Sequence, residues 1–346
     1  TILRPQRHFE TLLYTGNGTT GQSITGLEFK PDLIWIKSRS FGNNSHLFDS
    51  VRGVNKILRS STDDDEDTIS GVMSSFNHGG FTVQEASGNN ATNDDSSTFV
   101  AWCWKGGGAA VANTDGTLNS QVSVNEEAGF SIVSWTSTGT TGSTIGHGLG
   151  KKPDWIILKG RNTSEAQPWR TYHTSVGPTG GTQLESTNDF AAQTGVWNDT
   201  QPTSSVFTVG SFGSTNENGK NYIAYCWHEV PGFSKFGSYE GNNNSDGPYI
   251  HLGFRPAWVM IKNIDADSTE WYILDSTRDT DNPAGQYLSA SSSAQEATYI
   301  FYDFLSDGFK LRNTGSAQNP SSGTIIYIAF AEQPGTTPFD TFPNAR

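Results

Sequence analysis

The chain has 346 residues, enough for two or three domains with hydrophobic cores of their own. Its net charge of -13 is repelled by phosphate backbones and anionic lipid, so we expect no nucleic-acid partner and no membrane insertion. Only 34% of the residues are apolar, and they are rich in Phe, Tyr and Trp, which favours short aromatic strands and polar turns over long helices.

The first predicted elements are short strands separated by Gly- and Asn-rich turns. In chain order they are RHFETLLYTG (7–16), the proline-anchored strand FKPDLIWIK (29–37), HLFDSVRG (46–53), HGGFTV (78–83) and the closing strand FVAWCWK (99–105). No helical segment separates them, so we expect antiparallel pairing in a β-sandwich or jelly-roll unit.

The same order of elements recurs twice more along the chain. The second copy reads GFSIVSWTSTG (129–139), GKKPDWIILK (150–159), RTYHTSVG (170–177), SSVFTVG (204–210) and YIAYCWHE (222–229). The third copy reads GFSKFGSYEG (232–241), FRPAWVMIK (254–262), YILDSTRD (272–279), SDGFKL (306–311) and YIAFAE (327–332). The prolines of the three anchored strands are 122 and 103 residues apart, and the central alanines of the closing strands are 123 and 105 residues apart. Two landmarks with nearly the same unequal spacing indicate an internal repeat.

We therefore predict an all-β chain of three tandem antiparallel β-sandwich (jelly-roll-like) repeats packed together. The predicted divisions are repeat 1 at 1–105, a surface linker at 106–128, repeat 2 at 129–230, repeat 3 at 231–333 and an extended C-terminal arm at 334–346. The arm contains three prolines and cannot be a central strand, and we expect it to contact a neighbouring subunit.

The stretch GNGTTG (16–21) fits the glycine fingerprint of a dinucleotide-binding turn, which requires a helix directly after it. Here a strand follows, and the sister loops STGTTG (137–142) and GNNNSDG (241–247) do not keep the fingerprint. The sequence therefore predicts a turn, and we expect no cofactor. The three loops are predicted to be exposed and free to vary.

Cysteines and histidines offer no catalytic or metal-binding pattern. Cys103 and Cys226 occupy the same position of two closing strands, where the third copy has Ala331, so each is predicted to be a small buried side chain. The seven histidines lack the spacing of a zinc site, and His173 stands where the other copies have Asp49 and Asp275.

Three charged patterns have both a structural and a ligand-binding interpretation. Asp49 with Arg52, and Asp275 with Arg278, are three residues apart, and we favour pairing across a turn over ligand recognition. DDDED (63–67) has five carboxylates but lacks the alternating spacing of a calcium loop, and NNNSDG (242–247) has turn composition. A solvated loop is the favoured interpretation of both, with calcium binding at 63–67 left open.

Tryptophans are the most suggestive material for binding. Trp169, Trp197 and Trp271 lie near predicted loops or strand edges, where an exposed ring flanked by Asn and Asp suits stacking on a sugar. Burial against a neighbouring copy is the favoured interpretation of these three, and the remaining anchored-strand and closing-strand tryptophans are predicted to be core residues.

Nearly the whole chain resembles a repeat family from marine bacteriophages, cyanophages among them. The resemblance is carried by GLEFKPDLIWIKSRS, HLFDSVRG, AWCWK, IGHGLGKKPDWIILK, AYCWHEVPGFSKFGSYEGN, GFRPAWVMIK and the final NAR. Members are usually described as virion structural or tail-fibre-like proteins. The resemblance implies a place on a phage particle without saying which place. Our leading hypothesis is a virion surface protein of a tail or head appendage, oligomeric and in contact with other virion proteins. It supplies no catalytic or binding residues.

Two rival functions remain. A carbohydrate-binding module would place the loop-edge tryptophans against host surface glycans. A glycan-degrading enzyme would need two carboxylates across a cleft, and no such pair stands out, so we expect a non-enzymatic protein.

Overall fold

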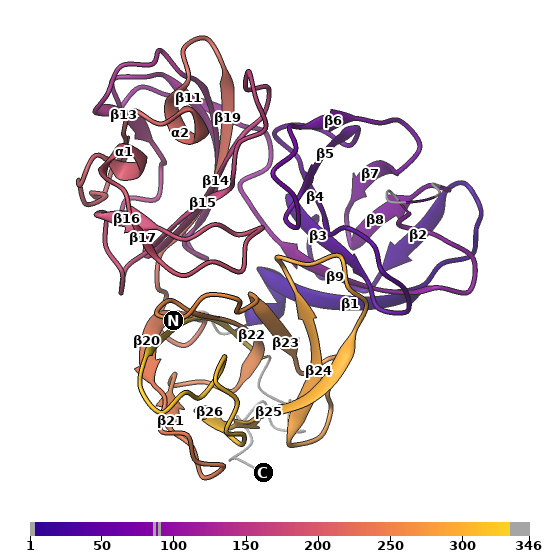
Figure 1. Cartoon of the computed structure of the whole chain (residues 1–346). Helices are drawn as coiled ribbons and strands as arrows, with labels where there is room; N and C mark the ends of the chain where they lie inside the picture. The colour runs from indigo at the N-terminus through magenta and orange to yellow at the C-terminus, as the bar shows by residue number, and fades with distance from the viewer. Residues whose placement is uncertain (1–3, 86–87, 89–90, 333–346) are drawn as a thin grey trace.

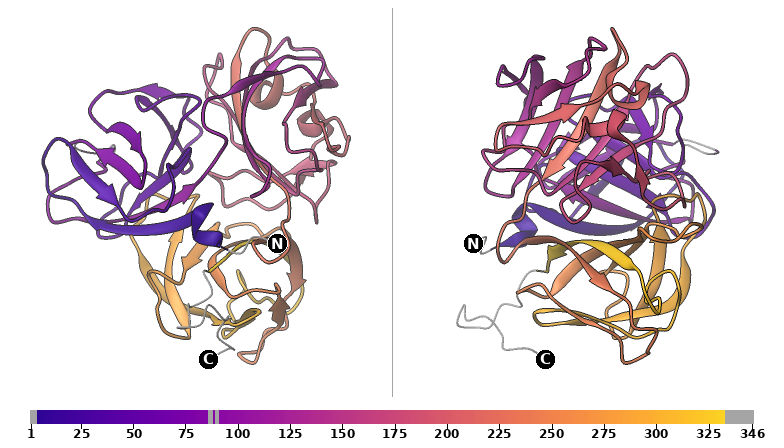
Figure 2. Two further views of the ribbon diagram at one scale, coloured as in Figure 1. Left: turned by 180° about the vertical axis from the view of Figure 1, so that it is seen from behind. Right: turned by 60° about the vertical axis from the view of Figure 1, so that its left-hand side comes forward.

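The computed structural model describes residues 4–85, 88 and 91–332. The described chain is almost entirely antiparallel β-structure, with the one-turn helices α1 (Thr194–Trp197) and α2 (Gly213–Asn216) and the 3-10 turn η1 (Pro5–Arg7). Figures 1 and 2 show three lobes arranged around a common centre. The first lobe comprises β1 to β9, the second β10 to β19 and the third β20 to β27. The predicted C-terminal arm at 334–346 lies outside the described residues.

The first lobe pairs a large sheet with a small one. The large sheet has the order β1-β9-β3-β4-β5-β6 and the small sheet the order β2-β8-β7. The large-sheet strands are β1 (Phe9–Thr15), β3 (Leu33–Ser38), β4 (His46–Asp49), β5 (Lys56–Arg59), β6 (Asp67–Thr68) and β9 (Thr98–Trp104). The small-sheet strands are β2 (Gln22–Thr25), β7 (Met73–Asn77) and β8 (Gly80–Val83).

The second lobe has a large sheet of order β10-β11-β12-β19-β14-β15 and two short ribbons, β13-β18 and β16-β17. The large-sheet strands are β10 (Val111–Asn113), β11 (Ser120–Asn125), β12 (Phe130–Thr136), β14 (Trp155–Gly160), β15 (Arg170–His173) and β19 (Asn221–Trp227). The ribbons are built from β13 (Ser143–Gly146), β16 (Gly180–Gly181), β17 (Ala191–Ala192) and β18 (Val206–Val209). Part of the predicted linker 106–128 therefore belongs to this sheet. Because β12 is open on one side, β11 pairs with it along its length and β10 pairs with β11.

The third lobe has one eight-stranded sheet of order β20-β27-β22-β23-β24-β25-β26-β21, which curls over its own core. Its strands are β20 (Ser234–Glu240), β21 (Tyr249–His251), β22 (Pro256–Asn263), β23 (Tyr272–Asp275), β24 (Ala284–Ser289), β25 (Ala297–Leu305), β26 (Gly308–Leu311) and β27 (Thr324–Ala331).

One four-strand order is common to the three large sheets. It reads β1-β9-β3-β4 in the first lobe, β12-β19-β14-β15 in the second and β20-β27-β22-β23 in the third. In each case the opening strand pairs with the closing strand, which pairs with the proline-anchored strand. The predicted strands are therefore present and antiparallel, and they pair in the same way three times.

Each closing strand is buried on both faces, which explains its continuous apolar sequence. In β9, Phe99, Ala101 and Cys103 face a core inside the first lobe, whereas Val100, Trp102 and Trp104 face a core that all three lobes share. The strands β19 and β27 alternate in the same way. The period of two thus divides each closing strand between the core of its own lobe and the shared core.

Candidate functional site: the three lobe interfaces

The shared core brings one aromatic cluster together from all three lobes. The ring centroids of Trp104 and Trp258 are 6.0 Å apart, those of Trp104 and Trp227 are 6.0 Å apart, and those of Trp102 and Trp258 are 6.3 Å apart. All three pairs are edge-to-face, the arrangement that places the positive rim of one ring on the negative face of another. This cluster therefore joins the three lobes through specific contacts as well as through burial.

Around this core, three buried lysines connect the lobes in a closed cycle. Each is the last residue of the proline-anchored motif, and its ammonium donates to a backbone carbonyl of a neighbouring lobe. The bonds run from Lys37 Nζ to Ser292 O at 2.6 Å, from Lys159 Nζ to Asp63 O at 2.7 Å and from Lys262 Nζ to Thr187 O at 3.0 Å. The first lobe thus binds the third, the second binds the first and the third binds the second. We call these three residues the lysine ring.

Burial has the same electrostatic effect on each member of the lysine ring. It lowers the pKa of Lys37, Lys159 and Lys262 to about 8, and nearby carboxylates such as Glu270 and Glu185 only partly oppose this. The three ammonium groups still carry their charge at neutral pH. Each therefore needs its carbonyl partners, because a buried charge without hydrogen bonds is costly.

Two of the interfaces also contain a buried Asp–Arg turn. Asp49 accepts hydrogen bonds from the backbone N–H groups of Val51 and Arg52, and its Oδ2 pairs with Arg52 Nε. Tyr225 of the second lobe donates its hydroxyl to the same oxygen at 2.7 Å. The predicted pairing across the turn is confirmed, and the pair also contacts a neighbouring lobe.

The third lobe repeats this arrangement against the first. Arg278 Nε lies 2.6 Å from Asp275 Oδ2, and Trp102 Nε1 donates to that oxygen at 3.0 Å. Trp102 and Tyr225 occupy the same position of their closing strands. An aromatic side chain with a polar tip is therefore used at both interfaces to hold the carboxylate.

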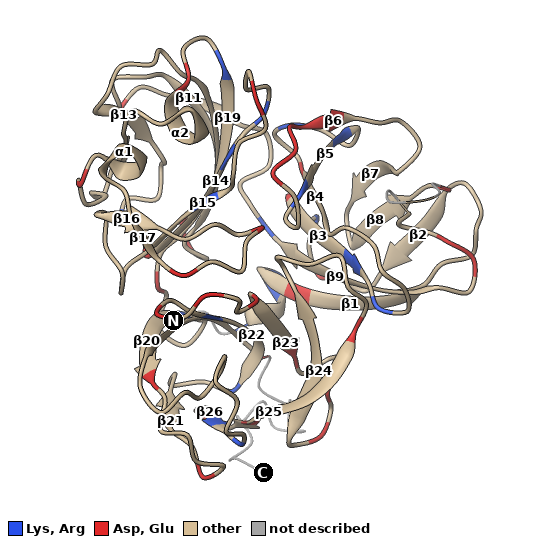
Figure 3. Cartoon of the chain, in the orientation of Figure 1, with Lys and Arg blue, Asp and Glu red and all other residues tan. Residues whose placement is uncertain are grey.

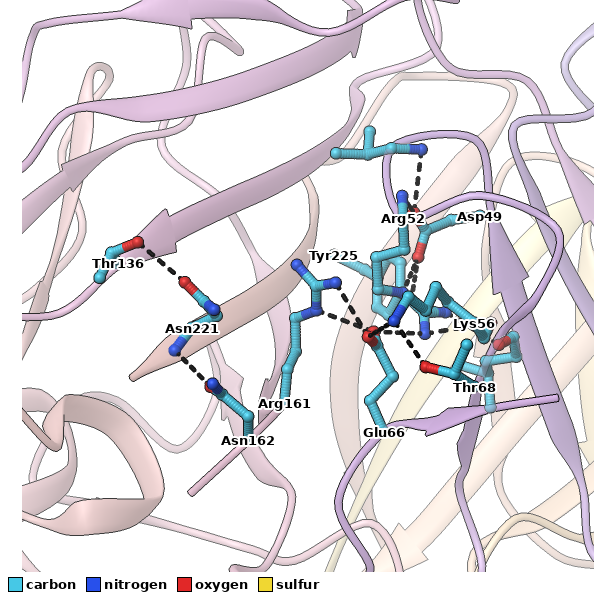
Figure 4. Close-up of polar contacts among 12 residues, drawn as sticks. Asp49, Arg52, Lys56, Glu66, Thr68, Thr136, Arg161, Asn162, Asn221 and Tyr225 are labelled. Atoms are coloured by element: carbon cyan, nitrogen blue, oxygen red, sulfur yellow. Dashed lines mark hydrogen bonds and ion pairs between the residues drawn. The ribbon is translucent and has the colours of Figure 1, made fainter. Parts of the chain in front are cut away.

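A glutamate extends each Asp–Arg turn into a network that crosses the interface. Glu66 of the first lobe receives a forked pair of bonds from Arg161 of the second, at 2.8 and 2.9 Å, and lies 3.3 Å from Arg52 Nη1 (Figure 4). Burial alone would raise the pKa of Glu66, but the bonds and charges of Arg161 and Arg52 outweigh it and lower that pKa. Glu66 is therefore ionised across the neutral range.

The equivalent glutamate of the third lobe is Glu296. Arg39 of the first lobe binds it through two bonds of 3.0 and 2.9 Å, and Arg278 Nη1 lies 3.0 Å from its Oε2.

Figure 3 shows charged residues of both signs where β4 to β6 approach the second lobe. Most of the remaining ribbon in that view is tan, the colour of residues other than Lys, Arg, Asp and Glu.

In the part of the chain that the structure describes, the interface between the second and third lobes has the same backbone contact but no such network. Phe190 N donates to Ile264 O at 3.0 Å, as Glu66 N donates to Arg161 O at 3.0 Å and Glu296 N to Arg39 O at 3.1 Å. Every polar member of the network is replaced here at once. The replacements are His173 for Asp, Val176 for Arg of the turn, Phe190 for Glu, Ile264 for the crossing Arg and Phe330 for the polar-tipped aromatic.

His173 is the one ionisable group among these replacements. It is buried, its Nε2 lies 3.2 Å from Tyr327 O of the third lobe, and burial lowers its pKa to about 4. It is therefore neutral at physiological pH. The joint replacement of five positions indicates that the network acts as one unit, since a partly satisfied buried network is worse than an apolar one.

The acidic run 63–67 is only partly the solvated loop that was predicted: Asp63 and Asp64 are exposed, but the run also contacts the second lobe. Asp63 supplies the carbonyl that Lys159 binds, and Asp65 accepts a 2.6 Å bond from the Thr163 hydroxyl. Within the described part of the chain, no group of His, Cys, Asp or Glu side chains is arranged to hold a metal ion. The run functions as an interface segment, and NNNSDG (242–247) forms the predicted turn.

GNGTTG is the turn between β1 and β2, as predicted, and Gly18 and Gly21 have φ of 62° and 90°. The three sister loops are less free to vary than expected, because a buried asparagine holds each one. Asn93 Nδ2 bonds Thr19 O at 2.7 Å, Asn216 Nδ2 bonds Thr140 O at 2.8 Å and Asn319 Nδ2 bonds Asn244 O at 2.8 Å. These asparagines, and the lysine ring, were not given a role from sequence. For the lysines the available signal was their constant place six residues after the proline, whereas the asparagines stand 8, 8 and 10 residues before the central alanine of the closing strand.

The remaining sequence candidates are all buried. Cys103 and Cys226 are free thiols in separate cores, and burial raises the pKa of both. All ten tryptophans are at most 4% exposed, so none is available to stack on a sugar. Trp169 Nε1 bonds Arg59 O of the first lobe at 2.8 Å and Trp271 Nε1 bonds Gln183 O of the second at 2.9 Å. These two serve the interfaces.

A cavity of about 270 Å³ lies beside the interface of the second and third lobes. Its lining consists of Arg170, Gly181, Gln183, Asn188, Asp189, Ala191, Gln193 and Asp267. All but Asp267 belong to the second lobe. The cavity is therefore next to the one interface that lacks the charged network.

A family model described as a domain of unknown function (DUF7483) matches residues 4–334. No curated protein and no solved structure matches the chain. In the described residues, no helix is long and apolar enough to span a membrane.

Proposed function

We propose the following role for this chain, which belongs to the DUF7483 family: it is a non-enzymatic structural protein of a phage virion appendage. Its body is proposed to consist of three tandem β-sandwich repeats. It is placed at the virion surface, in a tail or head fibre-like part, as a homo-oligomer in contact with other virion proteins and able to contribute to host attachment.

The closed cycle of lobe interfaces is the observation that carries this proposal. Lys37, Lys159 and Lys262 each bind the next lobe in turn, so every lobe is both a donor and an acceptor of the same contact. A cycle of three such contacts leaves no lobe free to move without breaking two interfaces. A rigid body of this kind suits a part of an appendage that must keep its shape and resist extracellular proteases.

The position of the buried ionisable side chains in the lobe interfaces also supports a structural role. The buried acids and bases described above serve the interfaces, where they form ion pairs and bind backbone carbonyls. Catalysis instead requires groups with perturbed pKa values that converge on an open cleft. Because all ten tryptophans are buried, they no longer support a tryptophan-based carbohydrate-binding module.

Mass spectrometry of purified phage particles, followed by a cryo-electron microscopy map, tests the proposed location. We expect the chain in stoichiometric amount on the particle surface, with the three-lobed body visible in the appendage. Absence of the chain from particles purified to constant infectivity would refute the proposal. Light scattering of the isolated chain then tests the oligomer separately, because a monomeric mass refutes only that part.

A further inference from the structure

We propose that the cavity beside the second and third lobes is a binding site for a neutral monosaccharide-sized polyol. The cavity lies between β15, the β16–β17 ribbon and the third-lobe loop that contains Asp267. In Figure 1, β16 and β17 occupy the side of the second lobe nearest the third. This site goes beyond the structural role proposed above and does not depend on it.

Arg170 is the central donor of this cavity. It is 6% exposed, its Nε donates to Ser214 Oγ at 3.0 Å and its Nη1 donates to Gln193 Oε1 at 2.8 Å. Both partners are neutral, and the described residues give its Nη2 no hydrogen bond. The guanidinium carbon also lies 5.8 Å from the centre of the Phe212 ring. A buried guanidinium has five N–H donors, so several remain for a ligand in the cavity.

Carboxylates and amides supply the acceptors. Asp189 and Asp267 come from different lobes and are linked, because Asp267 Oδ1 accepts a 3.1 Å bond from Asp189 N. Gln183, Gln193 and Asn188 each present an amide that both donates and accepts. The lining thus combines one cation, two anions and three amides around a small space.

This combination selects the ligand chemistry. The two carboxylates repel a phosphate or sulfate, and Arg170 offsets part of their attraction for a cation. A polyol is uncharged, and each of its hydroxyls both donates and accepts, so it can use both kinds of group. The cavity volume of about 270 Å³ accommodates one sugar ring and no extended chain.

Saturation-transfer NMR on the full chain tests this site with glucose, galactose, mannose, N-acetylglucosamine and glycerol, and with sodium sulfate in competition. We expect at least one of the sugars to bind with a dissociation constant on the order of millimolar, as for a ligand of about a dozen heavy atoms. The variants Asp189→Asn and Gln193→Leu should each weaken binding at least about fivefold. Asp199→Asn, on an exposed turn outside the cavity, is the matched control and should bind like the parent.

Each outcome decides the proposal. Loss of sugar binding in the two cavity variants, with parent-like thermal midpoints and an unaffected control, supports it. No saturation transfer from any sugar, binding that the cavity variants leave unchanged, or displacement of the sugars by sulfate at equal concentration overturns it. The virion role is judged on particles, so either proposal can fail without the other.

Discussion

Removing the charge of Arg52 is the most direct way to test whether the interface network holds the lobes together. Its side chain is fully buried, and it pairs with Asp49 and Glu66 while its Nη2 donates to Leu47 O at 2.8 Å. In an Arg52→Val variant the Asp49 carboxylate stays buried without a cation and the Leu47 carbonyl loses its donor. Breaking a buried ion pair from one side costs about 3–5 kcal/mol, and an unsatisfied buried carbonyl adds about 1–3 kcal/mol, although the two terms are not additive. We expect a loss of about 4 kcal/mol in the free energy of unfolding.

Urea unfolding followed by tryptophan fluorescence measures this loss, because all ten indoles are buried. Arg4→Ala is the control, since Arg4 forms an exposed pair with Glu28 and should change stability by less than about 1 kcal/mol. A loss below about 1 kcal/mol for Arg52→Val would refute the reasoning, since an unpaired buried carboxylate costs several times that.

A five-residue graft tests whether the charged network can be replaced as a unit. The graft gives the interface between the first and second lobes the residues that stand at the equivalent positions between the second and third lobes. Because a buried ionic cluster can be exchanged for apolar residues at little cost when all members change, the graft should be more stable than Arg52→Val alone. A graft less stable than the single variant would show that the two interfaces are not equivalent. The substitutions are Asp49→His, Arg52→Val, Glu66→Phe, Arg161→Ile and Tyr225→Phe.

Burial lowers the pKa of Lys37, Lys159 and Lys262 to about 8, whereas a lysine in the unfolded chain has a pKa near 10.4. Between these two pH values the unfolded state therefore binds more protons than the folded state. The contribution of these lysines to the free energy of unfolding consequently increases as the pH rises. The urea midpoint should therefore increase more between about pH 8 and 9 in the parent than in Lys159→Met, and equal increments would contradict this assignment. Trp258→Ala should cost about 3–5 kcal/mol by calorimetry, and a cost below about 1 kcal/mol would show that the shared core is not formed. Asn216→Ala should speed hydrogen exchange in residues 137–142 and cost about 1–3 kcal/mol; unchanged exchange would mean that Asn216 does not hold that loop.

Sequence alone predicts the strands, their antiparallel pairing and the turn at GNGTTG, because strand periodicity and glycine turns are local properties. The interfaces are different, because they depend on which faces of three distant segments meet. The motif Asp49–Arg52 predicts its own ion pair, yet nothing near it in sequence indicates that Tyr225 completes it. The composition of DDDED predicts a solvated loop, and its contacts with Lys159 and Arg161 cannot be read locally because these residues lie about a hundred positions away.

The linker shows a second limit. Residues 106–128 have the composition of a surface connection, yet their strands β10 and β11 extend the sheet at the edge of β12. An open edge exists only in the assembled sheet, so composition alone predicts a linker where the structure has two strands. Conversely, the tryptophans near predicted loop ends are buried because a neighbouring lobe covers them, which no local pattern reveals.

The contact between the first and third lobes has a consequence for how the chain matures during synthesis. Lys37 bonds Ser292 across 255 residues, and Trp102 bonds Asp275 across 173. The first lobe is therefore synthesised before the third-lobe residues Trp258 and Asp275, which cover part of Trp102 and Trp104. Uncovered aromatic surface on a nascent domain promotes aggregation, and closure over such long separations is slow. We therefore expect the first lobe, made alone, to aggregate more readily than the full chain.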